Sequence, residues 1–264
     1  YETGRLYSGD ILRINYHTAF KSEIDPIHSS NLCAEITLPT KPFHDTISLY
    51  ERYSSEYAYI KLAGRKKEIV IKDLDKAKIL LNSLKKGQEY EGSIVTSIKQ
   101  KNEIALCNIA AINLCRDMTD EEYEEACYYA LRTVDYVIYN SEYPFPNVEY
   151  TSQQRMSAGI GIMNYAYELA RKGLFYTSEA AKKHSHFIAE RHFYSLVKAS
   201  LAISKERGNA PWIDRTKWPE GWLPIDTYEK NVDGIAQFEY RYDWEHLRSL
   251  VIANKGIAHS SLAG

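Results

Sequence analysis

Apolar positions recur with a helical period over the longest stretches of the second half of the chain. Ser178 to Glu206 is long enough for one continuous helix that ends at Gly208. Its core-facing positions are Phe193, Leu196, Val197 and Leu201, with Ser200 as a small residue on the same stripe. Thr119 and Glu122 have the spacing of a capping box, which predicts a second long helix that runs to about Asn140.

Shorter elements surround these two helices. Gly161 to Arg171 is expected to be a helix closed near Gly173, and Asp243 to Ala253 a final helix. Glu103 to Leu114 is an apolar strand candidate. The prolines of Tyr143-Pro144-Phe145-Pro146 indicate a rigid loop, and Trp212 to Pro224 is expected to be an aromatic loop.

The first forty residues are less regular. Tyr1 to Ile14 is interpreted as a strand-bearing start, and Lys21 to Ser30 as a loop. Asn31 to Leu38 alternates, which places Leu32, Ala34, Ile36 and Leu38 on one side and Asn31, Cys33, Glu35 and Thr37 on the other. Pro39 and Pro42 then end any regular element.

Residues 45–102 differ in texture from the rest. They are rich in lysine and include a predicted helix from Leu74 to Leu84 closed by Gly87. They also carry alternating stretches at Glu68-Ile69-Val70-Ile71 and Ser93-Ile94-Val95. The expected organisation is therefore a segment 1–44, a small inserted α+β module 45–102 and a mainly helical remainder 103–264. The basic clusters of residues 45–102 are interpreted as solvated surface. The alternative that this module binds nucleic acid or a partner stays open.

Composition and charge exclude little. The chain has 264 residues, a formal charge of −2 and an ordinary globular balance of 44% hydrophobic and 26% charged residues. No apolar run approaches the roughly 20 residues of a membrane span, and no signal peptide is predicted. The first residue is Tyr1, so an excerpt or processed piece of a longer chain is expected. Four cysteines without CxxC spacing favour reduced thiols and a cytoplasmic protein.

One short stretch concentrates chemistry. On an extended backbone Asn31, Cys33 and Glu35 share a face and present an amide, a thiol and a carboxylate together, whereas a helix would separate them. A neighbouring carboxylate disfavours the thiolate that a hydrolytic cysteine needs. A neutral thiol suits hydrogen-atom chemistry, with the carboxylate as a base and the amide holding a hydroxyl. The alternative is a buried structural cysteine on an ordinary strand.

Two other candidate sites are rejected. His184 and His186 are two apart on a predicted helix and face different ways, so no metal site with His192 is expected. Gly159 and Gly161 lack the third glycine and the preceding strand of a dinucleotide-binding fingerprint.

The motif from Ser30 to Ile36, followed by Leu38-Pro39-Thr40-Lys41-Pro42, resembles the finger loop of class I ribonucleotide reductase large subunits. Further similar segments follow in family order. They are Thr3-Gly4-Arg5-Leu6-Tyr7, Glu103-Ile104-Ala105-Leu106-Cys107, Tyr143-Pro144-Phe145-Pro146, Gly159-Ile160-Gly161-Ile162, Leu223-Pro224-Ile225-Asp226-Thr227-Tyr228 and Tyr242-Asp243-Trp244. They cover most of the chain outside 45–102.

The resemblance implies an α/β fold, as part of a ten-stranded barrel, and a role for each matching residue. Cys33 resembles the transient thiyl radical that removes the ribose 3′-hydrogen, and Glu35 the general base on the 3′-hydroxyl. Asn31 resembles the residue that binds the sugar hydroxyls. Cys107 resembles one of the two thiols that reduce the substrate, and nothing here matches the other. Cys115 and Cys127 match no family cysteine and are interpreted as packing residues.

The resemblance also implies partners. These are the remainder of the large subunit, a second copy in a homodimer, a small metal-containing subunit that generates the radical, and thioredoxin or glutaredoxin as reductant. The substrate would be a ribonucleoside diphosphate, reduced for DNA synthesis, and no cofactor or metal need bind this chain.

Three departures from the family pattern qualify this reading. The separation of Cys33 and Cys107 is unusually long, Ala258 and His259 stand where Arg-Asn is usual, and Gly264 precedes the family's phosphate-binding segment. A non-catalytic fragment that acts only by assembly with complementary pieces of a split subunit is the alternative.

Overall fold

The structure is a computed structural model that describes residues 9–31, 36–41, 50–51, 58–62, 68–71, 90–91, 103–106, 108–227 and 239–263. The chain forms two compact units, each described by itself. The first comprises Tyr1–Pro39, Leu106–Ser141 and Ser152–Gly264, and the second comprises Thr40–Ala105 and Glu142–Thr151.

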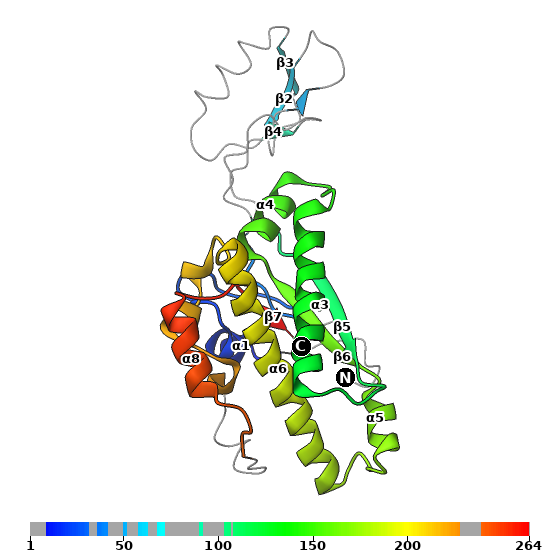
Figure 1. Ribbon diagram of the computed structural model, residues 1–264. Helices are drawn as coiled ribbons and strands as arrows, with labels where there is room; N and C mark the ends of the chain where they lie inside the picture. Colours follow the sequence, from blue (N-terminus) through cyan, green and yellow to red (C-terminus); the bar gives the residue numbers. More distant parts are fainter. Residues whose placement is uncertain are drawn as a thin grey trace. The chain divides into compact units, whose positions relative to one another are not determined.

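A parallel sheet organises the first unit. Its strands are β5 (Asn108–Asn113), β6 (Ala158–Met163) and β7 (Leu262–Ala263), in that order, and Ala158 pairs with both Asn108 and Leu262. Because parallel neighbours need long crossovers, helices lie between the strands along the chain. They are α3 (Asp120–Asn140) and α4 (Pro146–Arg155) before β6, then α5 (Tyr165–Arg171), α6 (Glu179–Arg207) and α8 (Trp244–Ala253) before β7 (Figure 1). The predicted α/β class is confirmed.

Helix α3 forms as predicted because both capping groups are in place. The Thr119 hydroxyl accepts the backbone N–H of Glu122, and the Glu122 carboxylate accepts the N–H of Thr119. The apolar side chains of α3 recur every three or four residues on the face that packs on β5 and β6. These buried residues are Tyr123, Cys127, Leu131, Val134 and Ile138.

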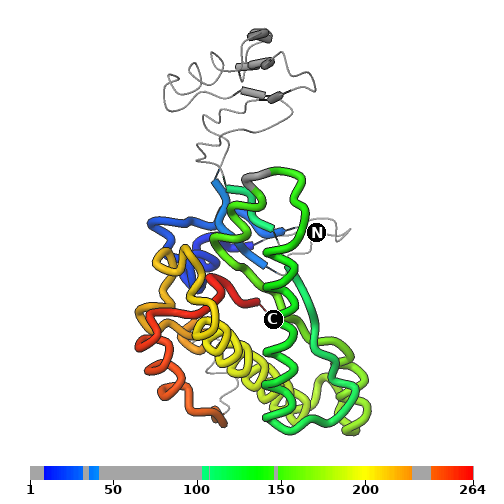
Figure 2. Tube along the Cα trace, turned by 45° about the horizontal axis from the view of Figure 1, so that its top comes forward, coloured from blue at the N-terminus to red at the C-terminus, as the bar shows by residue number. Residues whose placement is uncertain are grey.

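Helix α6 also matches its prediction, from the Ser178 cap to Gly208, whose φ of +90° suits glycine. The predicted core stripe is divided between two clusters. Leu196, Ala199 and Ile203 join α3 and the sheet, whereas Val197 and Leu201 face Trp218, Leu223 and α8. A helix buried on two sides between two clusters has little amphipathic contrast, which is why one stripe could not describe it. Figure 2 shows the end of the trace, with β7, close to α3 and α6.

The predicted strand at the start of the chain is wrong where the structure describes it. Residues Ile11–His17 form helix α1, because the Asp10 carboxylate caps the backbone N–H groups of Leu12 and Arg13. Leu12 is 80% exposed, so the apolar residues here do not mark a core strand.

The predicted helix from Gly161 begins too early. Residues Ala158–Met163 form the central strand β6, and Asn164, with a φ of +65°, separates it from α5. Gly159 packs closely on β5, since a Cβ there would lie 3.1 Å from Cγ2 of Ile109. The small residue at this position therefore allows the two strands to pack closely. The predicted end of the helix near Gly173 is confirmed, and Gly173 has a φ of +66°.

A smaller correction concerns the start of the strand that precedes α3. Strand β5 begins at Asn108, five residues later than the predicted strand, while Glu103 makes an antiparallel bridge to Lys41.

The two cysteines that were interpreted as packing residues differ in burial. Cys127 is fully buried, as predicted for a packing residue. Cys115 is exposed, so its interpretation as a packing residue is wrong.

The second unit contains an antiparallel sheet of β1 (Tyr50–Glu51), β2 (Ala58–Leu62), β3 (Glu68–Ile71) and β4 (Tyr90–Glu91), in which β2 pairs with the other three. The predicted strand at Glu68 is confirmed. Lys41 and Glu103 are joined by backbone hydrogen bonds of 3.1 Å and an ion pair of 3.0 Å. The predicted helix at 74–84, the strand at Ser93 and the basic clusters lie outside the described residues, and the three-part division stays a prediction.

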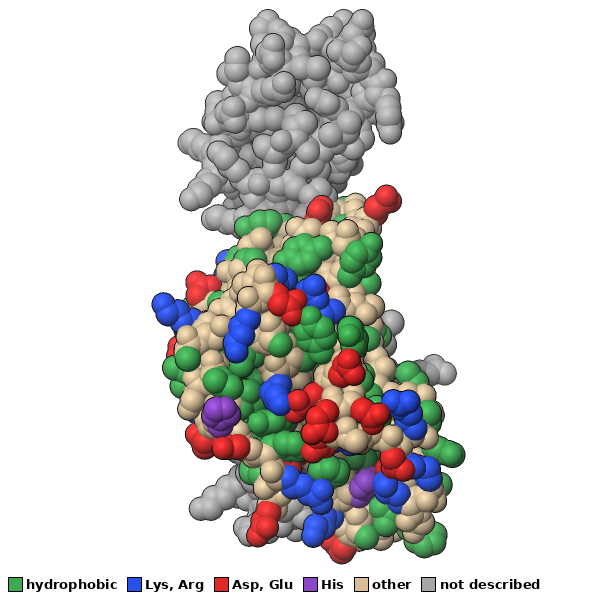
Figure 3. Space-filling view, in the orientation of Figure 1, with side chains coloured by type: hydrophobic (Ala, Val, Ile, Leu, Met, Phe, Trp, Pro, Cys, Tyr) green, Lys and Arg blue, Asp and Glu red, His purple; other side chains and the backbone are tan. Residues whose placement is uncertain are grey.

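Among the described residues on the face that Figure 3 presents, acidic and basic side chains are interspersed. This agrees with the formal charge of −2. None of the described helices is long and apolar enough to cross a membrane.

Candidate functional site

The described ends of the motif, residues 30–31 and 36–37, form two short antiparallel arms. Ser30 and Thr37 form an isolated bridge, and the Asn31 N–H donates to the carbonyl of Ile36 at 3.3 Å. The Ile36 N–H in turn donates to the Asn31 side-chain oxygen at 3.3 Å. Ile36 is buried and Asn31 half-buried. These arms are non-helical, as the spacing of the motif requires.

Of the predicted site residues, only Asn31 is described. Cys33 and Glu35 belong to the four residues that connect the arms, and they lie outside the described residues, as does Cys107. Their clustering on one face therefore stays a prediction. Cys107 directly precedes β5 in the sequence, and the first residue of β5 pairs with the first residue of β6.

Both ends of the segment that carries the arms are tied to the rest of the first unit. The Asn15 side chain accepts the Ile27 N–H at 2.7 Å and donates to the Ile27 carbonyl at 2.8 Å. The Arg155 guanidinium binds the Asp25 carboxylate at 3.2 Å and donates to the carbonyl of Pro39. Arg155 and Asp25 are 2% and 1% exposed, so this ion pair is shielded from water.

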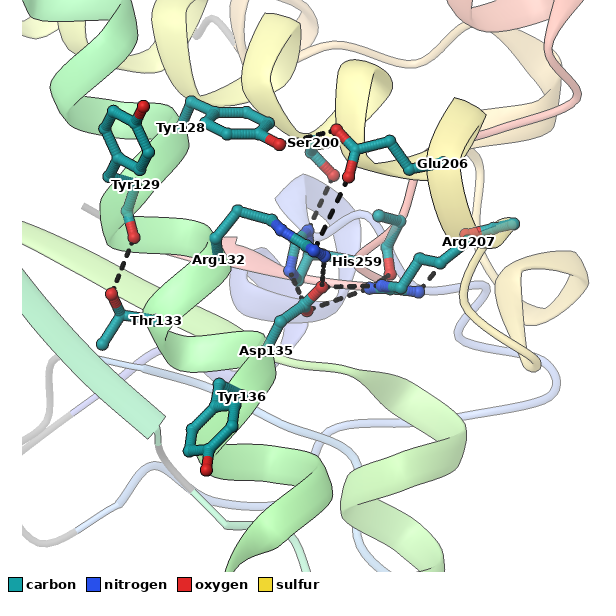
Figure 4. A network of polar contacts seen from close by, with 12 residues as sticks. Tyr128, Tyr129, Arg132, Thr133, Asp135, Tyr136, Ser200, Glu206, Arg207 and His259 are labelled. Atoms are coloured by element: carbon teal, nitrogen blue, oxygen red, sulfur yellow. Dashed lines mark hydrogen bonds and ion pairs between the residues drawn. The ribbon is translucent and has the colours of Figure 1, made fainter.

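A second buried polar network joins α3, α6 and the residues before β7 (Figure 4). Asp135 accepts two hydrogen bonds from Arg207, at 2.6 and 3.0 Å, and one from His259 Nε2 at 3.0 Å. Since a carboxylate only accepts, His259 carries its proton on Nε2, and Nδ1 accepts from the Ser200 hydroxyl at 2.8 Å. Arg207 also donates to the carbonyl of Ala258. Both positions that depart from the family pattern thus belong to this network.

Burial sets the ionisation of this network. Burial lowers the pKa of His259, and the hydrogen bond to Asp135 offsets only part of that effect. Burial alone would raise the pKa of Asp135, but the hydrogen bonds from His259 and Arg207 bring it below its usual value. The pKa of His192 is likewise lowered by burial, while Tyr123 and the carbonyl of Ile160 occupy its two nitrogens.

These two histidines should make the fold sensitive to mild acid. Their pKa values in the folded state lie below the ordinary 6.5, so the unfolded chain binds protons more readily as the pH falls below about 6.5. The contribution of these two histidines to the free energy of unfolding should therefore be fully present above that pH and should decrease below it. We expect the thermal midpoint to fall steadily between pH 7 and pH 5 in scanning calorimetry, by roughly 2–4 °C for each kcal/mol lost.

Replacement of the exposed His246 with glutamine is the control and should leave this pH dependence unchanged. A thermal midpoint that stays constant from pH 7 to pH 5 would contradict the prediction.

The other described residues offer little chemistry. No three histidine, cysteine, aspartate or glutamate side chains among them gather closely enough to hold a metal ion. Burial raises the pKa of the Cys127 thiol to about 12, which leaves it unreactive. A cavity of about 370 Å³ beside α6 and α8 has aromatic walls that include Phe193, Trp222 and Trp244.

Comparison with known proteins agrees with the sequence motifs. The family model "Ribonucleotide reductase, barrel domain" matches residues 1–263. The ribonucleoside-diphosphate reductase subunit alpha of Haemophilus influenzae is 32% identical over 98% of the chain and 28% of that relative. Subunit alpha of ribonucleoside-diphosphate reductase 1 of Escherichia coli is 33% identical over 99% of the chain and 28% of the relative. The subunit alpha of enterobacteria phage T4 is 29% identical over 93% and 25%.

Because this family model covers residues 1–263, the chain belongs to the ribonucleotide reductase family, and the parallel α/β sheet of the first unit fits that assignment. It spans about 28% of the length of the relatives named ribonucleoside-diphosphate reductase subunit alpha.

Sequence reasoning missed the residues that hold the candidate site in place. Arg155 and Asp25 are 130 positions apart, and no local pattern links them. His259, in the separate network with Asp135, stands at a position that departs from the family pattern, but no sequence pattern assigned it a role.

Proposed function

We propose that this chain is the catalytic barrel segment of a ribonucleoside-diphosphate reductase large subunit. The observation that carries the proposal is the family match along the whole chain together with the motif Ser30 to Ile36. The paired arms around Asn31 and the buried Ile36 support the proposal, because they hold the two described ends of this motif together. The three described parallel strands would form part of a ten-stranded barrel.

In the proposed reaction the Cys33 thiol gives up a hydrogen atom to a radical supplied by the small metal-containing subunit. The resulting thiyl radical takes the 3′-hydrogen of a ribonucleoside diphosphate, and Glu35 accepts the proton of the 3′-hydroxyl. The 2′-hydroxyl leaves as water, and two thiols supply two electrons and two protons while they form a disulfide. Cys33 then returns the hydrogen atom to the 3′-carbon, which regenerates the thiyl radical, and Glu35 returns the proton to the 3′-oxygen. Cys107 would be one of these thiols, and the other would come from the rest of the large subunit.

The direct test is an assay of the full-length protein that carries this chain. It should convert ribonucleoside diphosphates to deoxyribonucleotides when the small subunit and thioredoxin or glutaredoxin are present. If the chain is instead one product of a split gene, activity should appear only after a complementary piece is added. Absence of product in both arrangements would reject the catalytic proposal.

Glu35→Gln should slow the reaction without abolishing it. A positioned general base contributes about 10²- to 10⁴-fold, and glutamine keeps the shape of the side chain but cannot accept the proton. We expect kcat to fall by that factor while the thermal midpoint stays unchanged. Glu179→Gln, at an exposed position of α6, is the control and should retain full activity. An unchanged kcat for Glu35→Gln would remove the residue from its proposed role.

A further inference from the structure

The ion pair between Arg155 and Asp25 does more than connect two buried side chains. Along the chain, Asp25 precedes and Pro39 follows the two arms that pair at Ser30 and Thr37. The guanidinium of Arg155 contacts both Asp25 and Pro39. Each of the two contacts uses a different nitrogen of Arg155, so a planar, fixed group spans the base of the segment. A large change in the distance between Asp25 and Pro39 would therefore break at least one contact.

The surroundings of Arg155 fix its orientation. Its guanidinium lies 5.4 Å from the ring centre of Trp212 and 5.8 Å from that of Phe20. Arg215 approaches Asp25 from another direction at 3.6 Å, which keeps that carboxylate in place. The backbone carbonyl of Arg155 accepts the N–H of Ser260 at 2.9 Å, two residues before β7. Arg155 thus links the base of the arms to the parallel sheet.

A purely structural role would need less. One buried ion pair or an apolar residue of similar volume would fill this space, and such replacements are often neutral or stabilising. Arg155 instead places its charge where it reaches an acidic side chain and a backbone carbonyl at the two ends of one functional segment. Lysine has a single charged nitrogen without the planar fork, so it cannot reproduce both contacts in the same geometry.

We propose that Arg155 is a positioning residue that fixes the loop carrying Asn31, Cys33 and Glu35 relative to the parallel sheet. The inference rests on the proposed function for its catalytic consequence, and on the geometry of Asp25, Arg155 and Pro39 for its structural one. A misplacement of about 1 Å at a reacting group can cost 10²-fold in rate. Loss of the contacts from Arg155 to Asp25 and Pro39 should therefore lower kcat more than it changes KM, because substrate contacts outside this loop remain.

The test uses the full-length enzyme with its small subunit and compares wild type with Arg155→Lys and with Arg116→Met. Arg116 is exposed and lies 3.9 Å from the Glu122 carboxylate, so its replacement is the control. For Arg155→Lys we expect a folded protein, a kcat lowered by about 10- to 100-fold and a smaller change in KM. Substrate-dependent loss of the radical signal should slow by the same factor. A folded Arg155→Lys enzyme with wild-type kcat and radical loss would overturn the proposal.

A second measurement separates this inference from the proposed function. Hydrogen exchange of the Asn31 and Ile36 amides, which bond across the arms, should become faster in Arg155→Lys even if no nucleotide is reduced. Exchange in the Arg116→Met control should match wild type. Unchanged protection of both amides in the lysine variant would refute the positioning role. If Arg155→Lys does not fold, Asp25→Asn removes the same ion pair with little change of shape and is judged by the same two readouts.

Discussion

Cys33→Ser should abolish nucleotide reduction in the fully assembled enzyme, whereas Cys107→Ser should stop the reaction at a later step. The difference follows from the proposed roles. A serine hydroxyl holds its hydrogen too tightly to form a usable radical at this site, so no later step begins. Cys107 supplies electrons afterwards, so its loss should leave the reaction stranded after the 3′-hydrogen has been removed.

Two measurements distinguish the variants when the small subunit is present. Cys107→Ser should still show substrate-dependent loss of the radical and release of free base from a stalled nucleotide, and Cys33→Ser should show neither. Cys115→Ser is the control, because this thiol is exposed and has no proposed role, and it should retain activity. Deoxynucleotide formation by Cys33→Ser, or an identical stall in both variants, would show that the roles are wrongly assigned.

Asp135→Ala should cause the largest loss of stability among single changes in the network of Figure 4. The substitution removes the carboxylate that accepts from both the Arg207 guanidinium and the His259 N–H, in a site where Asp135 is 2% exposed. Removing one partner of a buried ion pair typically costs about 3–5 kcal/mol. For a domain of this size we expect the thermal midpoint to fall by roughly 6–20 °C.

The chain offers two matched comparisons for Asp135→Ala. Asp117 accepts the same two-fold hydrogen bonding from Arg171, at 2.7 and 2.8 Å, but is 77% exposed, so Asp117→Ala should change the midpoint little. Ser200→Ala removes one neutral hydrogen bond to His259 and should cost about 1 kcal/mol. The expected order of effect is Asp135, then Ser200, then Asp117. Equal effects of the two aspartate substitutions would contradict the argument from burial.

The helices that could be predicted are those whose ends are fixed by neighbouring residues. Each capping residue acts on the helical turn next to it. Thr119 and Glu122 begin α3, Ser178 begins and Gly208 ends α6, and Asp243 begins α8, so these helices lie close to their predicted bounds. The failures have a common cause. Ile11 to Ile14 and Gly161 to Met163 are short apolar runs that suit either a strand or a helix, and only pairing or capping decides between them.

The candidate site divides in the same way. The order Asn31, Cys33, Glu35 and the surrounding motifs suffice to indicate the family, because each motif is contiguous in the chain, and the family match confirms that assignment. The roles of these residues stay proposals. What fixes the arms in place, however, is absent from any local pattern.

The sequence by itself therefore determined the family and, through it, the α/β class, because each motif is contiguous in the chain. It also determined the capped helices, whose ends depend on residues within a few positions of one another. Only the tertiary structure brought Asp25 to Arg155 across 130 positions and Asp135 to His259 across 124. It also buried these charges, and so gave His259 its single protonated nitrogen. Such pairs depend on how strands and helices pack, because a buried charge needs a partner whatever its distance along the chain.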